Sequence, residues 1–225
     1  MSRDPNRRLF VEGPSDGSVI NRLVEARLGI DIATQRWVHA PPEEGGFEMA
    51  RASFVAALTA ETPSRLGLVV DRDNQHNAPD RWNSVRGILV AHGFEPPAEP
   101  GGGGIRLTRD LRRVGVWLMP DNVSPGDLES FLETLLPNPR PPSWDWAVEA
   151  TLTAKQQKGA AFRDPADQAK ARLHTWLAWN DPPGRPYGIA IKTQSLGVNS
   201  PTASAFIDWF QWLFVDTVMP ASSST

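Results

Sequence analysis

Hydrophobic and polar positions follow two alternating patterns over the first 136 residues. Short continuous apolar runs, such as 66–70, indicate buried strands. Between them, apolar residues recur every three or four positions, as in 16–28, which indicates amphipathic helices. These patterns predict strands over 7–13, 32–40, 65–73 and 114–121, and helices over 16–28, 47–61, 80–94 and 124–136. The alternation predicts an α/β domain with a mainly parallel sheet flanked by helices.

Two stretches interrupt this alternation. Residues 97–106 contain four consecutive glycines and predict a mobile loop or a hairpin connection. Residues 137–143 (PNPRPPS) form a stiff linker, so we place a boundary there, with an α/β domain over 1–140 and an extension over 141–225. The extension reads as mostly helical and contains six of the nine tryptophans. We expect it to pack on the α/β domain through its tryptophan faces, since aromatic residues at helical spacing usually lie in a core.

Composition excludes several kinds of site. The chain has no cysteine, which rules out disulfides, thiolate zinc sites, iron–sulfur clusters and cysteine nucleophiles. The net charge of -3 argues against a non-specific polyanion binder, unless clustered carboxylates hold divalent cations. No apolar run is long enough for a membrane span, and the N-terminus lacks the apolar region of a secretory signal. We therefore expect a cytoplasmic protein with no membrane partner.

Acidic residues end three of the predicted strands. Glu12 follows the first strand, Asp71 and Asp73 follow the third, and Asp121 follows the fourth. In an open parallel sheet, ligands bind outside the carboxyl ends of the strands, where such carboxylates can converge on a hard cation such as Mg²⁺. The alternative is that each acid caps a turn or a helix, an alternative that is weakest for Glu12 and the D-x-D pair taken together.

These residues also carry a family resemblance. The segments VEGPSD (11–16) and VVDRDN (69–74) resemble the Toprim domain of bacterial primases, of type IA and II topoisomerases and of the overcoming-lysogenization-defect nucleases. That domain has a glutamate after its first strand and a D-x-D after its third. Residues 115–132 and 173–179 look like a small uncharacterised bacterial family of stand-alone Toprim proteins. The resemblance implies a Toprim-like sheet over about residues 7–136.

The resemblance also implies roles for the acids. Glu12 would bind metal and act as a general acid or base, and Asp71 and Asp73 would bind Mg²⁺ (or Mn²⁺). Asp16 is similar to the second acid of the nuclease branch, which uses two metals; its alternative is a first-turn acid favoured by the helix dipole. Two later acids of that branch correspond to Asp121 and Glu129. For them the alternatives are a turn residue and a solvated helix residue, respectively.

The nuclease branch further uses a lysine to stabilise charge on the phosphate. Lys192 follows an apolar run that reads as a strand (GIAIKTQS) and is the first candidate, with Lys170 second. His174 is either a phosphate contact or a partly buried structural histidine. Tyr187, the only tyrosine, lies in a PPGRPYG turn, which disfavours transesterification through tyrosine.

The function implied by the resemblance is Mg²⁺-dependent hydrolysis of nucleic-acid phosphodiesters, with phage defence as a setting. The alternative is a non-catalytic Toprim-like partner or effector subunit of a separate ATPase. The expected partners are DNA or RNA, with an ATPase and a second copy of the chain as further candidates. A haloacid-dehalogenase-type phosphatase also begins with D-x-D, but there the motif follows an N-terminal strand and is followed by Thr or Val, whereas here Asn74 follows and the motif ends the third strand.

Overall fold

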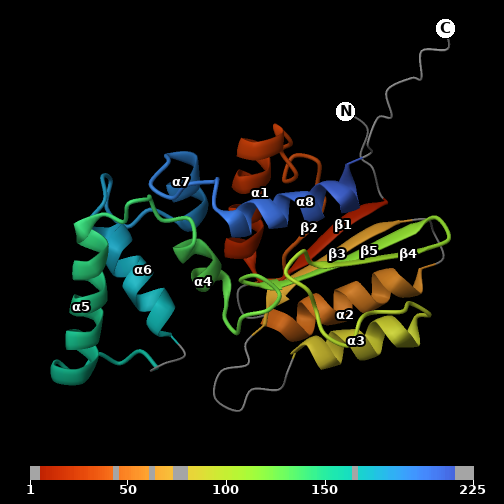
Figure 1. Ribbon diagram of the computed structural model, residues 1–225, viewed down its shortest axis with the longest axis horizontal. Coiled ribbons are helices and arrows are strands. Elements are labelled where there is room, and N and C mark those ends of the chain that lie inside the picture. The colour runs from red at the N-terminus through yellow and green to blue at the C-terminus, as the bar shows by residue number, and fades with distance from the viewer. Residues whose placement is uncertain (1–5, 43–45, 61–63, 73–80, 164–166, 216–225) are drawn as a thin grey trace, which may run out of the picture.

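The computed structural model describes residues 6–42, 46–60, 64–72, 81–163 and 167–215. Its centre is a five-stranded sheet in the order β2-β1-β3-β5-β4 (Figure 1). Neighbouring strands are parallel except at β4, which runs antiparallel to β5. The strands are β1 (Arg7–Val11), β2 (Val38–His39), β3 (Arg65–Asp71), β4 (Ile105–Arg109) and β5 (Arg112–Met119). The expected α/β class with a mainly parallel sheet is confirmed.

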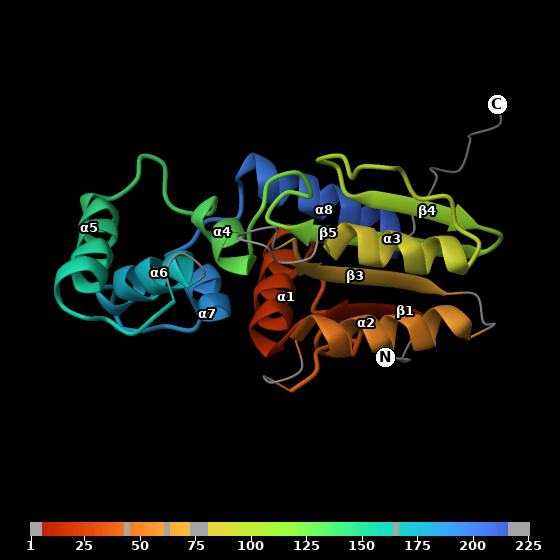
Figure 2. The ribbon, with the colours of Figure 1, turned by 90° about the horizontal axis from the view of Figure 1, so that it is seen from below.

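Helices cover both faces of this sheet (Figure 2). The helices of the described residues, only some of which lie on the sheet, are α1 (Pro14–Leu28), α2 (Gly46–Thr59), α3 (Arg81–Ala91), α4 (Leu128–Glu133), α5 (Pro142–Gln157), α6 (Gln168–Ala178), α7 (Tyr187–Lys192) and α8 (Pro201–Phe214). Side chains alternate along β1, so Leu9 and Val11 join the core under α1 and α8 while Phe10 joins the core under α2 and α3. No helix among the described residues is long and apolar enough to cross a membrane.

The extension divides into two parts. Helix α8 returns to the sheet, where Phe206, Trp209 and Phe210 are fully buried. Helices α5 and α6 instead lie beyond the end of the sheet, and both views show them side by side there (Figures 1 and 2). Not every tryptophan of the extension is packed. Trp176 is buried, while Trp179, three residues on, is 48 % exposed.

Several elements differ from the sequence prediction. Strand β2 has only two residues instead of the nine expected over 32–40, and β4 was not expected. Helix α4 begins at Leu128 rather than near Ser124, since the Asp127 side chain accepts from the Ser130 N–H and caps it. The run 188–192 is helical in α7 and not a strand. Helix α1 begins at Pro14, whose fixed φ suits a first turn, so Ser15 and Asp16 lie inside it.

Candidate functional site

The strand order reverses between β1 and β3, which places a crevice at the carboxyl ends of these two strands. Strand β1 connects through α1 to β2 on one side, whereas β3 connects through α3 to β4 and then β5 on the other. In open α/β sheets ligands bind at such a switch point. Glu12 directly follows β1 and Asp71 is the last residue of β3, so both expected acids lie at this edge.

Glu12 and Asp71 are linked through the backbone. The Asp71 N–H donates to Glu12 Oε1 at 2.8 Å, and Asp71 Oδ1 accepts from the Leu128 N–H, at the start of α4, at 3.0 Å. Arg81, the first residue of α3, forms an ion pair with Glu12 and stacks over the Phe47 ring. One edge of the sheet and two helix starts therefore fix the positions of both carboxylates.

Asp16 lies in the first turn of α1 and joins the same cluster. It is only 8 % exposed. Burial, followed by the charge of Glu12, raises the pKa of Asp16 to about 7. Burial, together with the charges of Glu12 and Asp16, also raises the pKa of Asp71 well above its usual range. Each carboxylate thus senses the others' charge, and a bound cation would offset this repulsion.

Glu129, on α4, is held by the extension. The Tyr187 hydroxyl donates to Glu129 Oε1 at 3.1 Å, and it lies 2.8 Å from His174 Nε2. Because a carboxylate only accepts, the Tyr187 oxygen is left to accept from the His174 Nε2–H. Burial, the Glu129 charge and the hydrogen bond to Glu129 raise the pKa of Tyr187, so Tyr187 stays a neutral phenol. Burial and then the charge of Lys170 lower the pKa of His174.

A cavity of about 730 Å³ brings these groups together. One wall carries carboxylates and comes from the β1–α1 turn, β3 and α4. The opposite wall comes from α6 and the segment leading into α7. The titratable side chains that line the cavity are Glu12, Asp16, Asp71, Glu129, Lys170, His174, Arg185 and Tyr187. The cavity therefore has an acidic wall and a largely basic wall.

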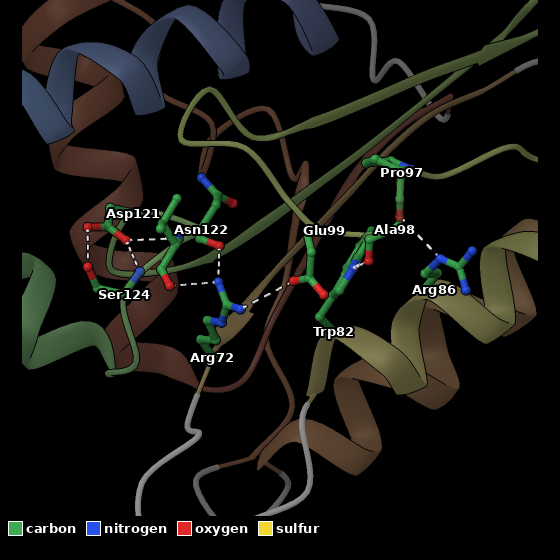
Figure 3. Close-up of polar contacts among 10 residues, drawn as sticks. Arg72, Trp82, Arg86, Pro97, Ala98, Glu99, Asp121, Asn122 and Ser124 are labelled. Carbon is green, nitrogen blue, oxygen red and sulfur yellow. Dashed lines mark hydrogen bonds and ion pairs between the residues drawn. The ribbon is translucent and has the colours of Figure 1, made fainter.

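The middle residue of the D-x-D sequence has an anchoring role (Figure 3). Arg72 is buried and donates to the carbonyl oxygens of Asn122 and Val123, in the turn between β5 and α4. Its guanidinium also lies 3.9 Å from the carboxylate of Glu99. Since this turn leads into α4, Arg72 holds the end of β3 against the segment that supplies Leu128 and Glu129.

Asp121 takes the place of a turn residue and does not line the cavity. Its carboxylate accepts from the N–H groups of Val123 and Ser124 at 2.9 and 2.6 Å, and from the Ser124 hydroxyl (Figure 3). Partial burial acts to raise the pKa of Asp121, yet these hydrogen bonds leave it lowered. These contacts are those of a turn residue, which is the alternative that the sequence offered for Asp121.

The remaining expected residues lie elsewhere. Lys192 ends α7 and lines a separate cavity with Arg22 and Glu25 of α1, so it is not beside the carboxylates. The segment before Lys192 resembles a strand in sequence but forms the helix α7, and the Lys192 side chain lines this second cavity. Lys170, the second candidate, lines the carboxylate cavity. Asp73 lies outside the described residues.

Oxygen donors in this cluster suit a hard divalent cation, although their present arrangement is not that of a finished site. Among the described residues, no three histidine or acidic side chains stand close enough together to hold one ion. Glu12 also pairs with Arg81. Metal binding would thus require Glu12 to turn from Arg81 toward Asp16 and Asp71, with water completing the coordination.

Sequence reasoning gave no role to Arg185 and Arg81, and gave Tyr187 no part in a site. Two of them depend on contacts between segments more than 50 residues apart, which are Arg81 with Glu12 and Tyr187 with Glu129. For the basic side of the cavity, the sequence offered one signal. Lys170 and His174 are four residues apart in a segment expected to be helical, so they share one helix face.

A family model described as "Protein of unknown function (DUF3226)" matches residues 6–215, and the chain belongs to this family. The match spans both the sheet and the helices of the extension. No curated protein and no solved structure matches the chain.

Proposed function

We propose that this DUF3226 protein is a Mg²⁺- or Mn²⁺-dependent hydrolase of nucleic-acid phosphodiesters, built on a Toprim-like sheet. The observation that carries the proposal is the meeting of Glu12, Asp16 and Asp71 at the switch point of the sheet, in a cavity with basic side chains opposite. Phosphoryl chemistry needs mainly positioning and neutralisation of charge on the phosphate, and this cavity offers groups for both.

The carboxylates would hold the cation. Glu12, Asp16 and Asp71 are the candidate ligands, and Glu129 lies further along the same wall. The raised pKa values of Asp16 and Asp71 mean that the cluster resists full ionisation, so a divalent cation is the natural counter-charge. When bound, the cation would polarise the phosphate and lower the pKa of an attacking water.

The chain's own residues would then divide the remaining work. Glu12 can accept a proton from the attacking water, which is the role that the Toprim resemblance implies for this acid. Lys170 lines the same cavity and can neutralise charge on the bound strand, whereas the sequence suggested Lys192 first for a phosphate contact. Tyr187 and His174 fix the orientation of Glu129.

One observation favours a second candidate, a non-catalytic Toprim-like partner of a separate ATPase. The ion pair between Arg81 and Glu12 satisfies the acid that catalysis would need most. In a site without catalytic function, such a pair would serve to hold α3 against the end of β1.

Cleavage assays separate these candidates. Full-length wild type and Asp71→Asn are incubated with labelled single-stranded and duplex DNA and RNA, with Mg²⁺, Mn²⁺ or EDTA. We expect metal-dependent cleavage that EDTA abolishes and that Asp71→Asn lowers by about 100-fold or more. The matched control is Asp110→Asn, at an exposed turn position with φ 52°, which asparagine tolerates. No cleavage under any condition, with a stable complex between this chain and an ATPase, would support the partner instead.

A further inference from the structure

Two cations on the basic wall have no acidic partner in the part of the chain that the structure describes. Lys170, on α6, and Arg185, just before α7, form no ion pair within the described residues, and Lys170 Nζ has no hydrogen bond there. Lys170 acts on Glu129 and Asp167 only through its charge. Asp167 is itself paired with Arg163. Two neighbouring cations that form no ion pair in the described residues are suited to an anionic ligand.

Arg185 is held in place by hydroxyl groups rather than by a carboxylate. Its Nη1 donates to Thr193 Oγ1, and to Ser195 Oγ at 3.4 Å. Its Nε is buried and has no hydrogen-bond partner in the described part of the chain. Hydroxyls orient the guanidinium without neutralising it, so its full charge is left for a ligand. A planar guanidinium also matches a phosphate with two parallel hydrogen bonds.

We propose that Lys170 and Arg185 form a phosphate-binding subsite, and that this subsite takes a phosphate neighbouring the scissile one in a single-stranded nucleic acid. The proposal rests on the proposed function, which assigns the scissile phosphate to the carboxylate wall. Both walls line one cavity, so two successive phosphates of a strand could be held by opposite walls.

The size of the cavity favours a single strand. About 730 Å³ lies within the range of cavities that enclose one small ligand. A single strand can thread its backbone into such a space with its bases turned outward. A duplex is stiff over about 150 base pairs and cannot fold its backbone into a space of this size.

Binding measured without metal tests the subsite independently of catalysis. Fluorescence anisotropy with a labelled 12-nucleotide single strand, and with the duplex of the same sequence, is followed in EDTA over a range of salt concentrations. The proteins are the full-length wild type, Lys170→Met, Arg185→Met and Arg185→Lys. Lys158→Met, at the end of α5 and away from the cavity lining, is the matched control for loss of one positive charge. Thermal melts verify that each variant is folded.

We expect the single strand to bind more tightly than the duplex. Lys170→Met and Arg185→Met should each weaken single-strand binding about tenfold and reduce the salt slope by about one, with Arg185→Lys between them and wild type. Folded Lys170→Met and Arg185→Met proteins that bind like Lys158→Met, or equal binding of duplex, would overturn the subsite.

The two proposals fail in different ways. If the variants lose binding as expected but wild type cleaves nothing with any metal, the subsite stands and the hydrolase proposal fails. If wild type cleaves and Lys170→Met and Arg185→Met cleave and bind as well as wild type, the hydrolase stands and the subsite fails.

Discussion

The pKa of Asp16 links the carboxylate cluster to protein stability. Burial and Glu12 raise this pKa from 3.8 to about 7. Between these values the folded chain keeps a proton that the unfolded chain has released, so the free energy of unfolding falls as pH rises from about 4 to 7. In metal-free buffer, we expect Asp16→Asn to remove much of this fall and to stabilise the protein at pH 8 by roughly 2–4 kcal/mol.

Urea unfolding at pH 5 and pH 8 in EDTA measures this effect. Asp145→Asn, an acid in the first turn of α5 outside the cavity, is the control and should leave the pH dependence as in wild type. An Asp16→Asn protein that is less stable at pH 8 than wild type would mean that the acid is a structural cap.

Two lysines offer a direct contrast. Lys170 lines the carboxylate cavity and Lys192 lines another, although the sequence favoured Lys192. If cleavage occurs, Lys170→Met should lower its rate at subsaturating substrate by about tenfold, since the change weakens binding of the neighbouring phosphate. Lys192→Met should stay within about twofold, as expected for a group remote from the reaction. Single-turnover cleavage measures both rates. A larger loss for Lys192→Met than for Lys170→Met would mean that Lys192 is the lysine that contacts the phosphate.

The contact between α8 and the sheet depends on glycines. A Cβ at Gly115, on β5, would lie 2.8 Å from Leu213 Cδ2 and 2.9 Å from the Trp209 ring. We expect Gly115→Ala to cost about 1–3 kcal/mol of unfolding free energy, because the buried helix has to shift. Gly87→Ala, in α3 where a Cβ meets nothing within 4 Å, should instead stabilise by about 0.5–1 kcal/mol. Chemical denaturation of both variants checks the pair, and equal effects would contradict the packing described here.

Strong local patterns predicted most of the sheet, while short elements depended on distant contacts. The continuous apolar runs of β3 and β5 identified both strands, because strands buried on both faces need such runs. The segment 188–192 is also apolar, but it packs against α1 as a helix, and periodicity cannot decide over so few residues. Helix α4 starts later than predicted because Asp121 binds the N–H of Ser124 in a turn before it, and Asp127 caps the helix through the N–H of Ser130.

The acidic half of the site was predictable and the basic half was not. Glu12 and Asp71 follow apolar strands, and parallel strands bring their carboxyl ends to one edge. Lys170, Arg185 and Tyr187 reach the cavity only because α6 and α7 fold back over α1 and α4. No spacing in the sequence encodes that return.

The cavity joins the sheet to the extension, so the extension is part of the candidate site. Arg172 of α6 pairs with Glu133 of α4, and α7 packs along α1. The sheet provides the carboxylates and the extension provides the cations. A family match over residues 6–215 agrees with a unit that includes both.

The core also runs through both parts. Phe206 of α8 is fully buried and contacts Trp117 of β5 and Phe131 of α4, with ring centroids 5.2 and 6.0 Å apart. We expect Phe206→Ala to cost about 3–5 kcal/mol. Trp146→Ala, on the exposed side of α5, should stay within about 0.5 kcal/mol. Calorimetric melts of the two variants test this, and a mild effect at Phe206 would mean that α8 is not part of the core.

Crystals soaked in Mn²⁺ test the central claim most directly, because anomalous scattering locates the ion itself. The account predicts a peak bounded by Glu12, Asp16 and Asp71, facing the cavity, with Glu12 turned from Arg81 and the peak lost in Asp71→Asn crystals. Absence of a peak at these carboxylates in fully soaked wild-type crystals, with the Glu12–Arg81 pair intact, would contradict it.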